Sequence, residues 1–444
     1  MLRPLFFLCA AILVAGSASG AAKKPNILII LTDDQGYGDV GCYGAKDLLT
    51  PNLDRLIGEG MRFDFFRANS PVCSPTRAAL LSGKYPDRVG VPGVIRTDPK
   101  NSWGFLAPSA VLLPKALKDA GYHSALVGKW HLGLTRPNTP NARGFDFFHG
   151  FLGDMMDDYM THQRKGANLM YLNTELIEPV GHATDIFSAW ACDYLRGRAK
   201  EDGPFFLYLA YNAPHDPVQP PAEWLAKVKQ RQPELPEKRA KLAALIEHLD
   251  DGIGRVLAAL KESGLENDTM VFFMSDNGGS LPHGAFNGDT RDGKGSMFEG
   301  GLRVPCAVRW PGKIAAGSRT DAAATSMDVF ATALEAAGLP APDDIDAISL
   351  LPLLTGKAGQ LAERDLYFVR REGGGFKGQT TQAIIRGPWK VLQNTPSGPL
   401  ELYNLDADKL ETTLSNKTAV PQLDGLGSAL QQQIKRGTEV PWHE

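Results

Sequence analysis

The residues with the clearest chemical potential begin at Cys73, in a polar turn that leads into an apolar segment. Pro75 suits the first turn of a helix because its missing N–H costs nothing there, and Gly83 is a suitable helix stop. Cys73 is therefore predicted at a helix N-terminus, where unpaired N–H groups and the helix dipole favour negative charge. Arg77 lies one helical turn away and can reach the same place. Together they predict an anion site, whereas Cys73 alone favours a buried structural cysteine.

Polar groups also follow four short apolar runs, each predicted as a buried strand. The runs span residues 25–31, 124–127, 205–210 and 270–274. In open α/β sheets ligands bind at the carboxyl ends of the strands, so the groups at these ends are expected to meet. They are Asp33, Asp34, Lys129, His131, His215, Asp276 and Asn277.

The oxygen donors in this set predict a metal site. Asp33, Asp34, Asp276 and Asn277 favour Ca²⁺, with Mg²⁺ as the alternative, over zinc. No Cys/His cluster has the spacing of a zinc site. The Asp-Asp pair alone would more often be a solvated turn, so the prediction rests on the combination.

Cationic groups complete the predicted site. They are Arg77, Lys129, His131, His215 and Lys294, the last in a glycine-rich loop at residues 292–305. Each alone is more often an exposed lysine or a partly buried histidine. Around one nucleophile and one cation, they suit sulfuryl or phosphoryl transfer, in which charge shifts onto oxygens that must be neutralised. Glu299 and Arg303 are instead expected to form a structural ion pair.

The elements that must position these groups alternate along the chain. Helices are predicted at residues 111–120, 185–195, 241–260 and 328–337. Alternating strands and helices favour an α/β domain with a largely parallel sheet, assigned to residues 23–355. Short strands at 365–369, 381–386, 389–392 and 400–405, and a helix at 428–435, predict a small antiparallel α+β subdomain over residues 356–444.

Composition and the N-terminal segment indicate an exported protein and give no sign of a nucleic-acid-binding or membrane-spanning one. The 444 residues carry a net charge of −3, which gives no indication of a nucleic-acid partner. Residues 1–22 have a basic start, an apolar core and a small-residue run, the pattern of a signal peptide. Neither this core nor any later run is long enough to span a membrane, so export to the periplasm or medium is expected. Cys42, Cys192 and Cys306 allow at most one disulfide.

Cys73-x-Pro75-x-Arg77 followed by Ala-Ala-Leu-Leu-Ser-Gly resembles the signature of type I sulfatases. Further blocks similar to those of this family occur in family order, at residues 33–39, 50–54, 128–133, 213–215, 275–278, 294–305 and 389–390. The resemblance is to the arylsulfatases and N-acetylgalactosamine sulfatases of the alkaline phosphatase superfamily. It implies a large, mostly parallel central sheet flanked by helices, with a small C-terminal antiparallel subdomain.

The resemblance also implies an activity, which is hydrolysis of sulfate esters of carbohydrates and of aryl sulfates. It implies that a formylglycine-generating enzyme converts Cys73 to formylglycine, whose hydrate is the nucleophile. Calcium would be bound by Asp33, Asp34, the modified Cys73, Asp276 and Asn277. By the same resemblance, Arg77 would stabilise the aldehyde hydrate, and Lys129, Lys294 and His215 would bind the sulfate. Asp276 would accept the proton of the attacking hydroxyl, and His215, alone or with Lys294, would protonate the leaving group. His131 would remove the proton of the second hydroxyl.

Two alternatives remain at this stage. A phosphoester or phosphonate hydrolase of the same superfamily would share the metal site, but the block at 128–133 argues against it. A non-catalytic glycan-binding homologue would keep the fold. The acidic stretch at 151–159 either lines the leaving-group pocket or is a solvated loop. The resemblance leaves the sulfated alcohol and the oligomeric state open.

Overall fold

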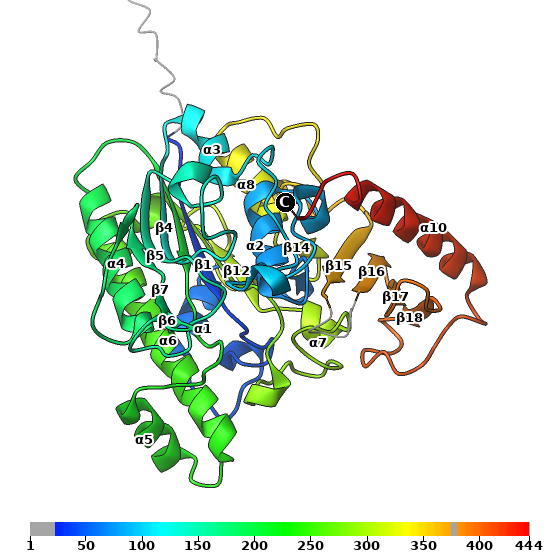
Figure 1. Cartoon of the computed structure of the whole chain (residues 1–444), viewed down its shortest axis with the longest axis horizontal. Coiled ribbons are helices and arrows are strands. Elements are labelled where there is room, and N and C mark those ends of the chain that lie inside the picture. Colours follow the sequence, from blue (N-terminus) through cyan, green and yellow to red (C-terminus); the bar gives the residue numbers. More distant parts are fainter. Residues whose placement is uncertain (1–22, 374–379, 444) are drawn as a thin grey trace, which may run out of the picture.

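A ten-stranded sheet forms the centre of the protein in the computed structural model, which describes residues 23–373 and 380–443 (Figure 1). The predicted signal peptide, residues 1–22, lies outside the described residues. The strand order is β13-β2-β12-β11-β1-β10-β4-β5-β8-β9. Their bounds are β1 (Asn26–Thr32), β2 (Met61–Phe63), β4 (His123–Lys129), β5 (Phe147–Phe151), β8 (Met170–Leu172), β9 (Glu175–Leu176), β10 (Phe205–Ala210), β11 (Thr269–Ser275), β12 (Cys306–Arg309) and β13 (Ser318–Thr320).

The five central strands are parallel and place the predicted site. β11, β1, β10, β4 and β5 run in one direction, whereas β12 and β8 are antiparallel to their central neighbours. All seven residues of β1 are buried, as expected of an apolar run covered on both faces. In the register Leu31 lies opposite both Ala210 and Met274, so the carboxyl ends of these strands meet at one edge. The mostly parallel sheet is therefore confirmed.

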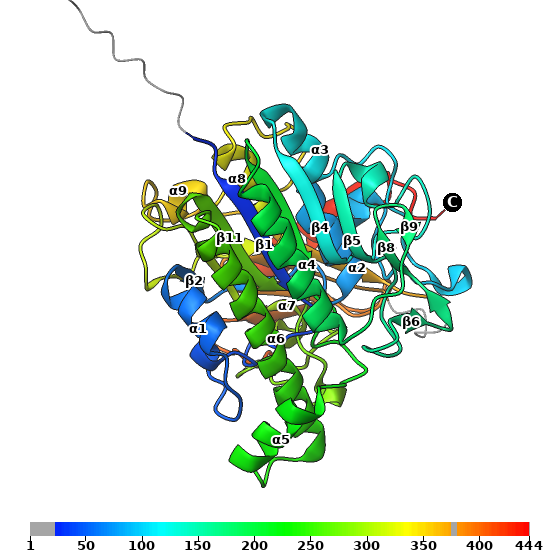
Figure 2. The ribbon, with the colours of Figure 1, turned by 90° about the vertical axis from the view of Figure 1, so that its left-hand side faces the viewer.

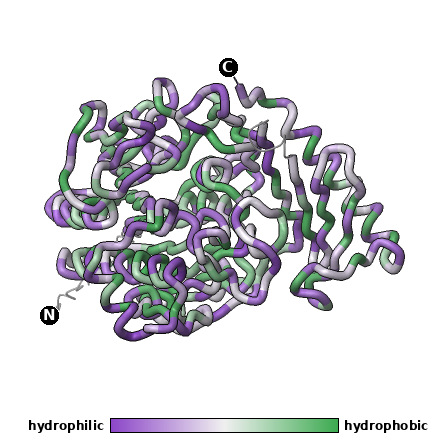
Figure 3. The backbone as a smooth tube through the Cα atoms, turned by 60° about the horizontal axis from the view of Figure 1, so that its bottom comes forward, coloured by the Kyte–Doolittle hydropathy of each residue, from purple (hydrophilic) through white to green (hydrophobic). Residues whose placement is uncertain are grey.

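Helices cover both faces of this sheet. On one face α1 (Pro51–Gly58), α4 (Ala183–Arg198) and α6 (Glu237–Glu262) pack on Leu28 and Ile30 of β1, and Figure 2 shows α4 and α6 crossing in front of the strands. On the other face α2 (Cys73–Ser82), α3 (Leu113–Leu117) and α8 (Asp328–Ala336) pack on the alternate residues Ile27 and Ile29. Hydrophobic stretches accordingly run through the middle of the large unit (Figure 3).

Three of the four helices predicted in this unit are confirmed, with small changes at their ends. The helix expected at 111–120 is shorter, since α3 begins at Leu113 and a 3-10 turn, η4 (Lys118–Ala120), follows it. Pro114 sets this start, because its fixed φ and missing N–H suit the first helical turn, and Leu112 before it is extended. The helices α1, α5 (Ala222–Arg231), α7 (Glu299–Leu302) and α9 (Leu351–Leu354) were not predicted.

The predicted C-terminal antiparallel sheet is confirmed as β15 (Leu366–Arg371), β16 (Thr380–Arg386), β17 (Trp389–Gln393) and β18 (Glu401–Asn404), paired in chain order. The helix α10 (Val420–Gly437) packs against β16 and β17 (Figure 1). It begins eight residues before the predicted helix, because Pro421 suits its first turn while Gly425 and Gly427 interrupt the sequence pattern. The boundary at residue 355 stays a prediction.

Buried charges join this small sheet to the large unit. The prediction that Glu299 and Arg303 form an ion pair is wrong. Glu299 instead pairs with Arg67 at 2.8 Å and with Lys390 of β17 at 3.2 Å. Lys390 is fully buried and needs counter-charges, which Glu299 and Glu411 supply. Arg303 donates to the Asp64 carbonyl and to the Tyr37 hydroxyl instead.

Two further expectations concern cysteines and membranes. Cys42, Cys73, Cys192 and Cys306 form no disulfide, which agrees with the limit of one bridge. Over the part of the chain that the structure describes, no helix combines the length and apolar character needed to cross a membrane.

Candidate active site

The predicted residues meet at the carboxyl edge of four neighbouring strands. Asp33 and Asp34 follow β1, Asp276 and Asn277 follow β11, His215 follows β10, and Lys129 and His131 lie at the end of β4. All seven are buried. Asp34 and His131 have positive φ values of 69° and 59°, a strained backbone found mainly where the surrounding structure enforces it. The predicted convergence of the four strand ends is confirmed.

Cys73 lies where the sequence predicted it, as the first residue of α2. Every residue of this helix is buried. The Thr76 hydroxyl fixes the turn before it, donating to the Ser70 carbonyl at 3.0 Å and accepting from the Ser70 amide at 3.1 Å. Burial raises the pKa of the Cys73 thiol, although Lys294 opposes this, so the unmodified side chain is a neutral and weak nucleophile.

Arg77 reaches from α2 to the carboxylates of the central strands. Its Nη2 donates to Asp276 Oδ2 at 2.7 Å and lies 3.5 Å from Asp33 Oδ2. Its Nη1 donates to the Lys129 carbonyl at 3.3 Å, and the Lys129 Nζ in turn donates to Asp33 Oδ2. Burial acts to raise the pKa of Asp33, but the charges of Lys129, His215 and Arg77 outweigh it and hold this pKa well below its usual range.

Lys294 and His215 form the opposite side of the cluster. Lys294 Nζ donates to Asp34 Oδ2 at 2.7 Å and lies 2.9 Å from His215 Nε2. His215 Nδ1 lies 2.7 Å from the Asp216 carbonyl, which can only accept. Nδ1 therefore carries a proton, and in neutral His215 Nε2 accepts from Lys294. Two groups that can hold a proton, Lys294 and His215, therefore lie side by side.

His131 lies close to the same charges and stays neutral. Its Nε2 lies 2.7 Å from the Ile95 carbonyl, so Nε2 carries the proton, while its buried Nδ1 has no hydrogen-bond partner. Burial, with Lys129 and Arg77 nearby, lowers the pKa of His131 well below its ordinary value. A neutral imidazole with an unpaired ring nitrogen can accept a proton.

The carboxylate cluster fits a hard cation. Asp33 Oδ1 and Asn277 Oδ1 are buried without a hydrogen-bond partner. Ligand atoms of Asp33, Asp34, Cys73 and His215 all lie within 4.8 Å of one another. Burial, reinforced by Asp33, raises the pKa of Asp276 to about 7, which shows how strongly the negative charges crowd. A divalent cation with oxygen ligands would satisfy the unpaired oxygens and relieve this repulsion.

A pocket of about 430 Å³ opens over Cys73. His131, His215 and Lys294 line it together with residues that the sequence did not single out as site residues, namely Arg96, Asp154, Met155, Arg164, Asp216 and Arg370. Asp154 and Met155 belong to the acidic stretch 151–159, so this stretch does line the pocket. Arg164 holds Asp154 through two hydrogen bonds of 2.9 Å. Arg96 and Arg370 come from segments without a motif, so no local pattern could have identified them.

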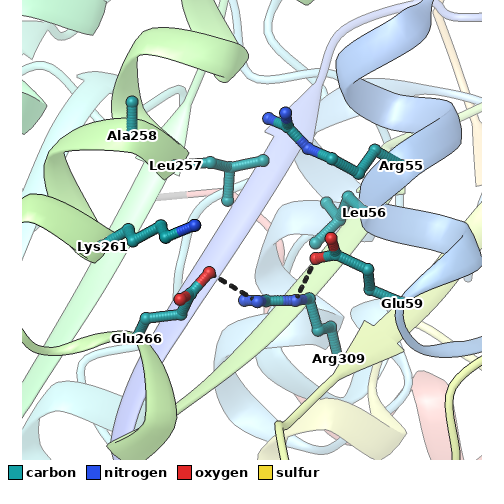
Figure 4. A pocket seen from close by; sticks show the side chains of 8 residues that line it. All are labelled: Arg55, Leu56, Glu59, Leu257, Ala258, Lys261, Glu266 and Arg309. Atoms are coloured by element: carbon teal, nitrogen blue, oxygen red, sulfur yellow. Dashed lines mark hydrogen bonds and ion pairs between the residues drawn. The ribbon is translucent and has the colours of Figure 1, made fainter.

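Two other polar clusters among the described residues make structural contacts. Figure 4 shows a smaller pocket of about 160 Å³, where Arg309 is held by Glu59 and Glu266. Glu266 precedes β11, so this pocket lies at the amino end of the sheet, away from Cys73. A second group consists of His182, Asp185 and His248. There His182 caps α4 by accepting from the Thr184 amide, and His248 pairs with Asp185 at 3.0 Å, which are structural roles.

Comparisons with known proteins agree with this geometry. A family model described as Sulfatase matches residues 25–339, and one described as N-sulphoglucosamine sulphohydrolase, C-terminal, matches residues 289–439. N-acetylgalactosamine-6-sulfatase of Canis lupus familiaris is 35% identical over 397 residues, covering 84% of this chain and 72% of that protein. Arylsulfatase A of Homo sapiens is 34% identical over 387 residues, covering 80% and 72%. The crystal structure of Ps i-CgsB in complex with k-i-k-neocarrahexaose superposes with a TM-score of 0.86, at 31% identity over 95% of each chain.

Proposed function

Since this chain belongs to the sulfatase family and is a sulfuric ester hydrolase, we propose that it is exported and desulfates carbohydrates through a formylglycine made from Cys73 and a bound calcium ion. The observation that carries the proposal is the convergence of Cys73, three fixed cations and a carboxylate cluster under one pocket. The relatives favour a carbohydrate, because one is named for N-acetylgalactosamine and another was crystallised with a neocarrahexaose.

Asp33, Asp34, Asp276, Asn277 and the modified Cys73 would hold the cation. Bound there, calcium would neutralise the carboxylates and polarise the sulfate, and the formylglycine hydrate would supply the attacking oxygen. Magnesium is the alternative ion. The buried unpaired oxygens of Asp33 and Asn277 support this ligand set.

The side chains around Cys73 would bind and orient the sulfate. Lys129 and Lys294 donate to Asp33 and Asp34, and each ammonium group would also donate a hydrogen bond to a sulfate oxygen. Arg77 is fixed by Asp276 and would stabilise the hydrated side chain. Fixed cations in a buried site stabilise the charge that develops on oxygen during transfer, because they need no reorganisation.

Proton transfers would be divided among three residues. Asp276, which accepts a hydrogen bond of 2.7 Å from Arg77, would accept the proton of the attacking hydroxyl. His215, once protonated on both ring nitrogens, would protonate the departing oxygen, alone or together with Lys294, whose Nζ lies 2.9 Å from its Nε2. His131, neutral and with Nδ1 unpaired, would accept the second hydroxyl proton so that sulfate leaves.

One experiment tests the proposal. The protein would be produced with a formylglycine-generating enzyme, the Cys73 peptide analysed by mass spectrometry, and the same batch assayed for sulfate and phosphate release from matched aryl esters. We expect an aldehyde at position 73 and dominant sulfate release, with Cys73→Ala inactive but folded. Dominant phosphate release would favour a phosphoester hydrolase, and an active Cys73→Ala protein would exclude the nucleophile. A panel of sulfated sugars would then identify the alcohol.

A further inference from the structure

Two further hollows lie in succession beside the pocket over Cys73, each sharing lining residues with the one before it. A second hollow of about 430 Å³ adjoins it, and Arg96 lines both. The chain after His131 passes from one to the other, since His131 lines the first and residues 132–135 line the second. A third hollow of about 410 Å³ shares Leu134 and Thr135 with the second. The three hollows together form what we name the extended groove, which leads away from Cys73.

The lining of the second hollow differs from that of the Cys73 pocket. Among the described residues that line it, Arg96 is the one side chain with a permanent charge. Apolar surfaces such as Phe105 and Leu132 alternate with hydroxyl and amide groups such as Ser102 and Asn138. This mixture matches a sugar ring, which presents apolar C–H faces and hydroxyl edges, better than it matches a purely apolar ligand.

Trp442 reaches the rim of this hollow from the C-terminal segment. After α10 the chain turns back toward α2 (Figure 1), and the Trp442 ring lies 5.6 Å from the Trp103 ring, measured between centroids. Two close backbone approaches fix this path. A Cβ added at Gly437 would lie 1.9 Å from Asp87 Oδ2, and one at Gly90 would lie 2.7 Å from the Pro441 carbonyl oxygen. Trp442 is therefore held in place, half-buried, beside the groove.

We propose that the extended groove binds the sugar units next to the sulfated one, so that the preferred substrate is an oligosaccharide or polysaccharide and not a sulfated monosaccharide. The inference rests on the proposed function and extends it to the length of the substrate. The shared lining residue Arg96 supports it, because a chain anchored by its sulfate over Cys73 would reach the second hollow, which Trp442 lines, past Arg96. The flat aromatic face of Trp442 can make a large contact with the C–H face of a sugar ring, and fixing this side chain loses little conformational entropy.

Binding to the full chain carrying Cys73→Ala, which prevents turnover, tests the groove separately from catalysis. The probes are chondroitin 6-sulfate and neocarrageenan oligosaccharides, each as a disaccharide and a hexasaccharide, titrated calorimetrically. We expect at least one hexasaccharide to bind about tenfold more tightly than its disaccharide. Adding Trp442→Ala should remove most of this gain, whereas Trp442→Phe should keep it. Trp224→Ala is the matched control, because Trp224 is also half-buried but lies on α5, outside the groove, so its substitution should leave the gain unchanged.

Equal affinity for disaccharide and hexasaccharide in both series, or a length gain that Trp442→Ala leaves intact, would overturn the inference. A sulfated peptide that binds better than every saccharide would also overturn it, since it would assign the groove to a protein substrate. Sulfate release separates the two proposals. A chain that shows the length gain and its loss in Trp442→Ala, yet releases no sulfate from any ester, keeps the groove and loses the proposed function.

Discussion

At the scale of single residues, the site consists of opposite charges that are largely buried. Arg77, Lys129 and Lys294 neutralise Asp276, Asp33 and Asp34, and five of the six side chains are almost fully buried. Removing one partner of such a pair leaves an uncompensated buried charge, which costs about 3–5 kcal/mol. Substitutions of the lysines or aspartates will therefore lower stability and activity together. Substitutions at His215 separate the two better.

His215→Gln should lower turnover in a way that depends on the leaving group. A sugar alkoxide leaves poorly and needs a proton, so kcat/KM for a sulfated sugar should fall by about 10²–10⁴-fold. An aryl sulfate with an acidic phenol should lose less than about tenfold. Sulfate release from both substrates measures this difference. His283→Gln is the matched control, because its side chain is 40% exposed and its Nδ1 lies 3.7 Å from Asp216 Oδ1. Equal losses on both substrates would contradict a role in protonation.

Removal of the metal ion should lower activity and stability together. A bound cation at 100 times its Kd stabilises the folded chain by about 2.7 kcal/mol, and without it the crowded carboxylates repel. Dialysis against a chelator, followed by assays of sulfate release and Tm, measures both effects. Calcium should restore both more fully than magnesium. Full activity in exhaustively metal-stripped protein would remove the metal from the mechanism.

At the scale of elements, the strands β1, β4, β10 and β11 were predicted well because each is a continuous apolar run, and the polar groups after the runs marked the edge where the site residues meet. The order β11-β1-β10-β4 could not be predicted, because parallel neighbours are far apart in the sequence and nothing local specifies the pairing. The groove residues Arg96 and Trp442 were missed for the same reason. Their role comes from where loops pack, not from any pattern in the loops.

One inter-helix contact illustrates such long-range dependence. The N-cap residue of α1, Thr50, makes no side-chain cap, and Asp250 of α6 replaces it. Its carboxylate accepts from the Leu53 amide at 2.8 Å and from the Asn52 amide at 3.1 Å. The helix start therefore depends on a residue almost 200 positions away.

Asp250→Ala should consequently lower the free energy of unfolding by about 2 kcal/mol, because it leaves these two amides without an acceptor. Urea denaturation of the purified variant would measure the loss. Asp251→Ala provides the control, since Asp251 is exposed and its 3.3 Å ion pair with Arg255 within α6 is worth no more than about 0.5 kcal/mol. Equal effects of the two substitutions would refute the capping role.

At the scale of the whole molecule, a buried acid joins the large unit to the C-terminal sheet and helix. Asp87 accepts from the Tyr367 hydroxyl of β15 at 3.0 Å, and the end of α10 closes on it at Gly437. Burial raises the pKa of Asp87 to about 6, although Arg371 opposes this. The acid therefore holds a proton in the folded chain at pH values where the unfolded chain has released it.

This proton predicts a pH dependence. Between about pH 4 and pH 6 the folded state binds more protons than the unfolded state, so the free energy of unfolding should fall as pH rises through this window, by up to roughly 3 kcal/mol from Asp87. Asp87→Asn should flatten that slope, whereas Asp193→Asn, at an exposed position on α4, should not. Urea unfolding at pH 4.5 and 7 provides the comparison. If the free energy of unfolding changed equally with pH in the wild type and in Asp87→Asn, Asp87 would not be the source of the pH dependence.

The central position of β1 has a consequence for the order of events during synthesis. β1 is the first strand made, yet it lies between β10 and β11, and β11 ends about 200 residues after Cys73. Until the ribosome has produced Ser275, the sheet that covers α2 is incomplete and Cys73, only 3% exposed in the finished fold, stays accessible. At about 5–20 residues per second this interval lasts roughly 10–40 s. An enzyme that modifies Cys73, as we propose, would have that time to act before the fold closes over its target.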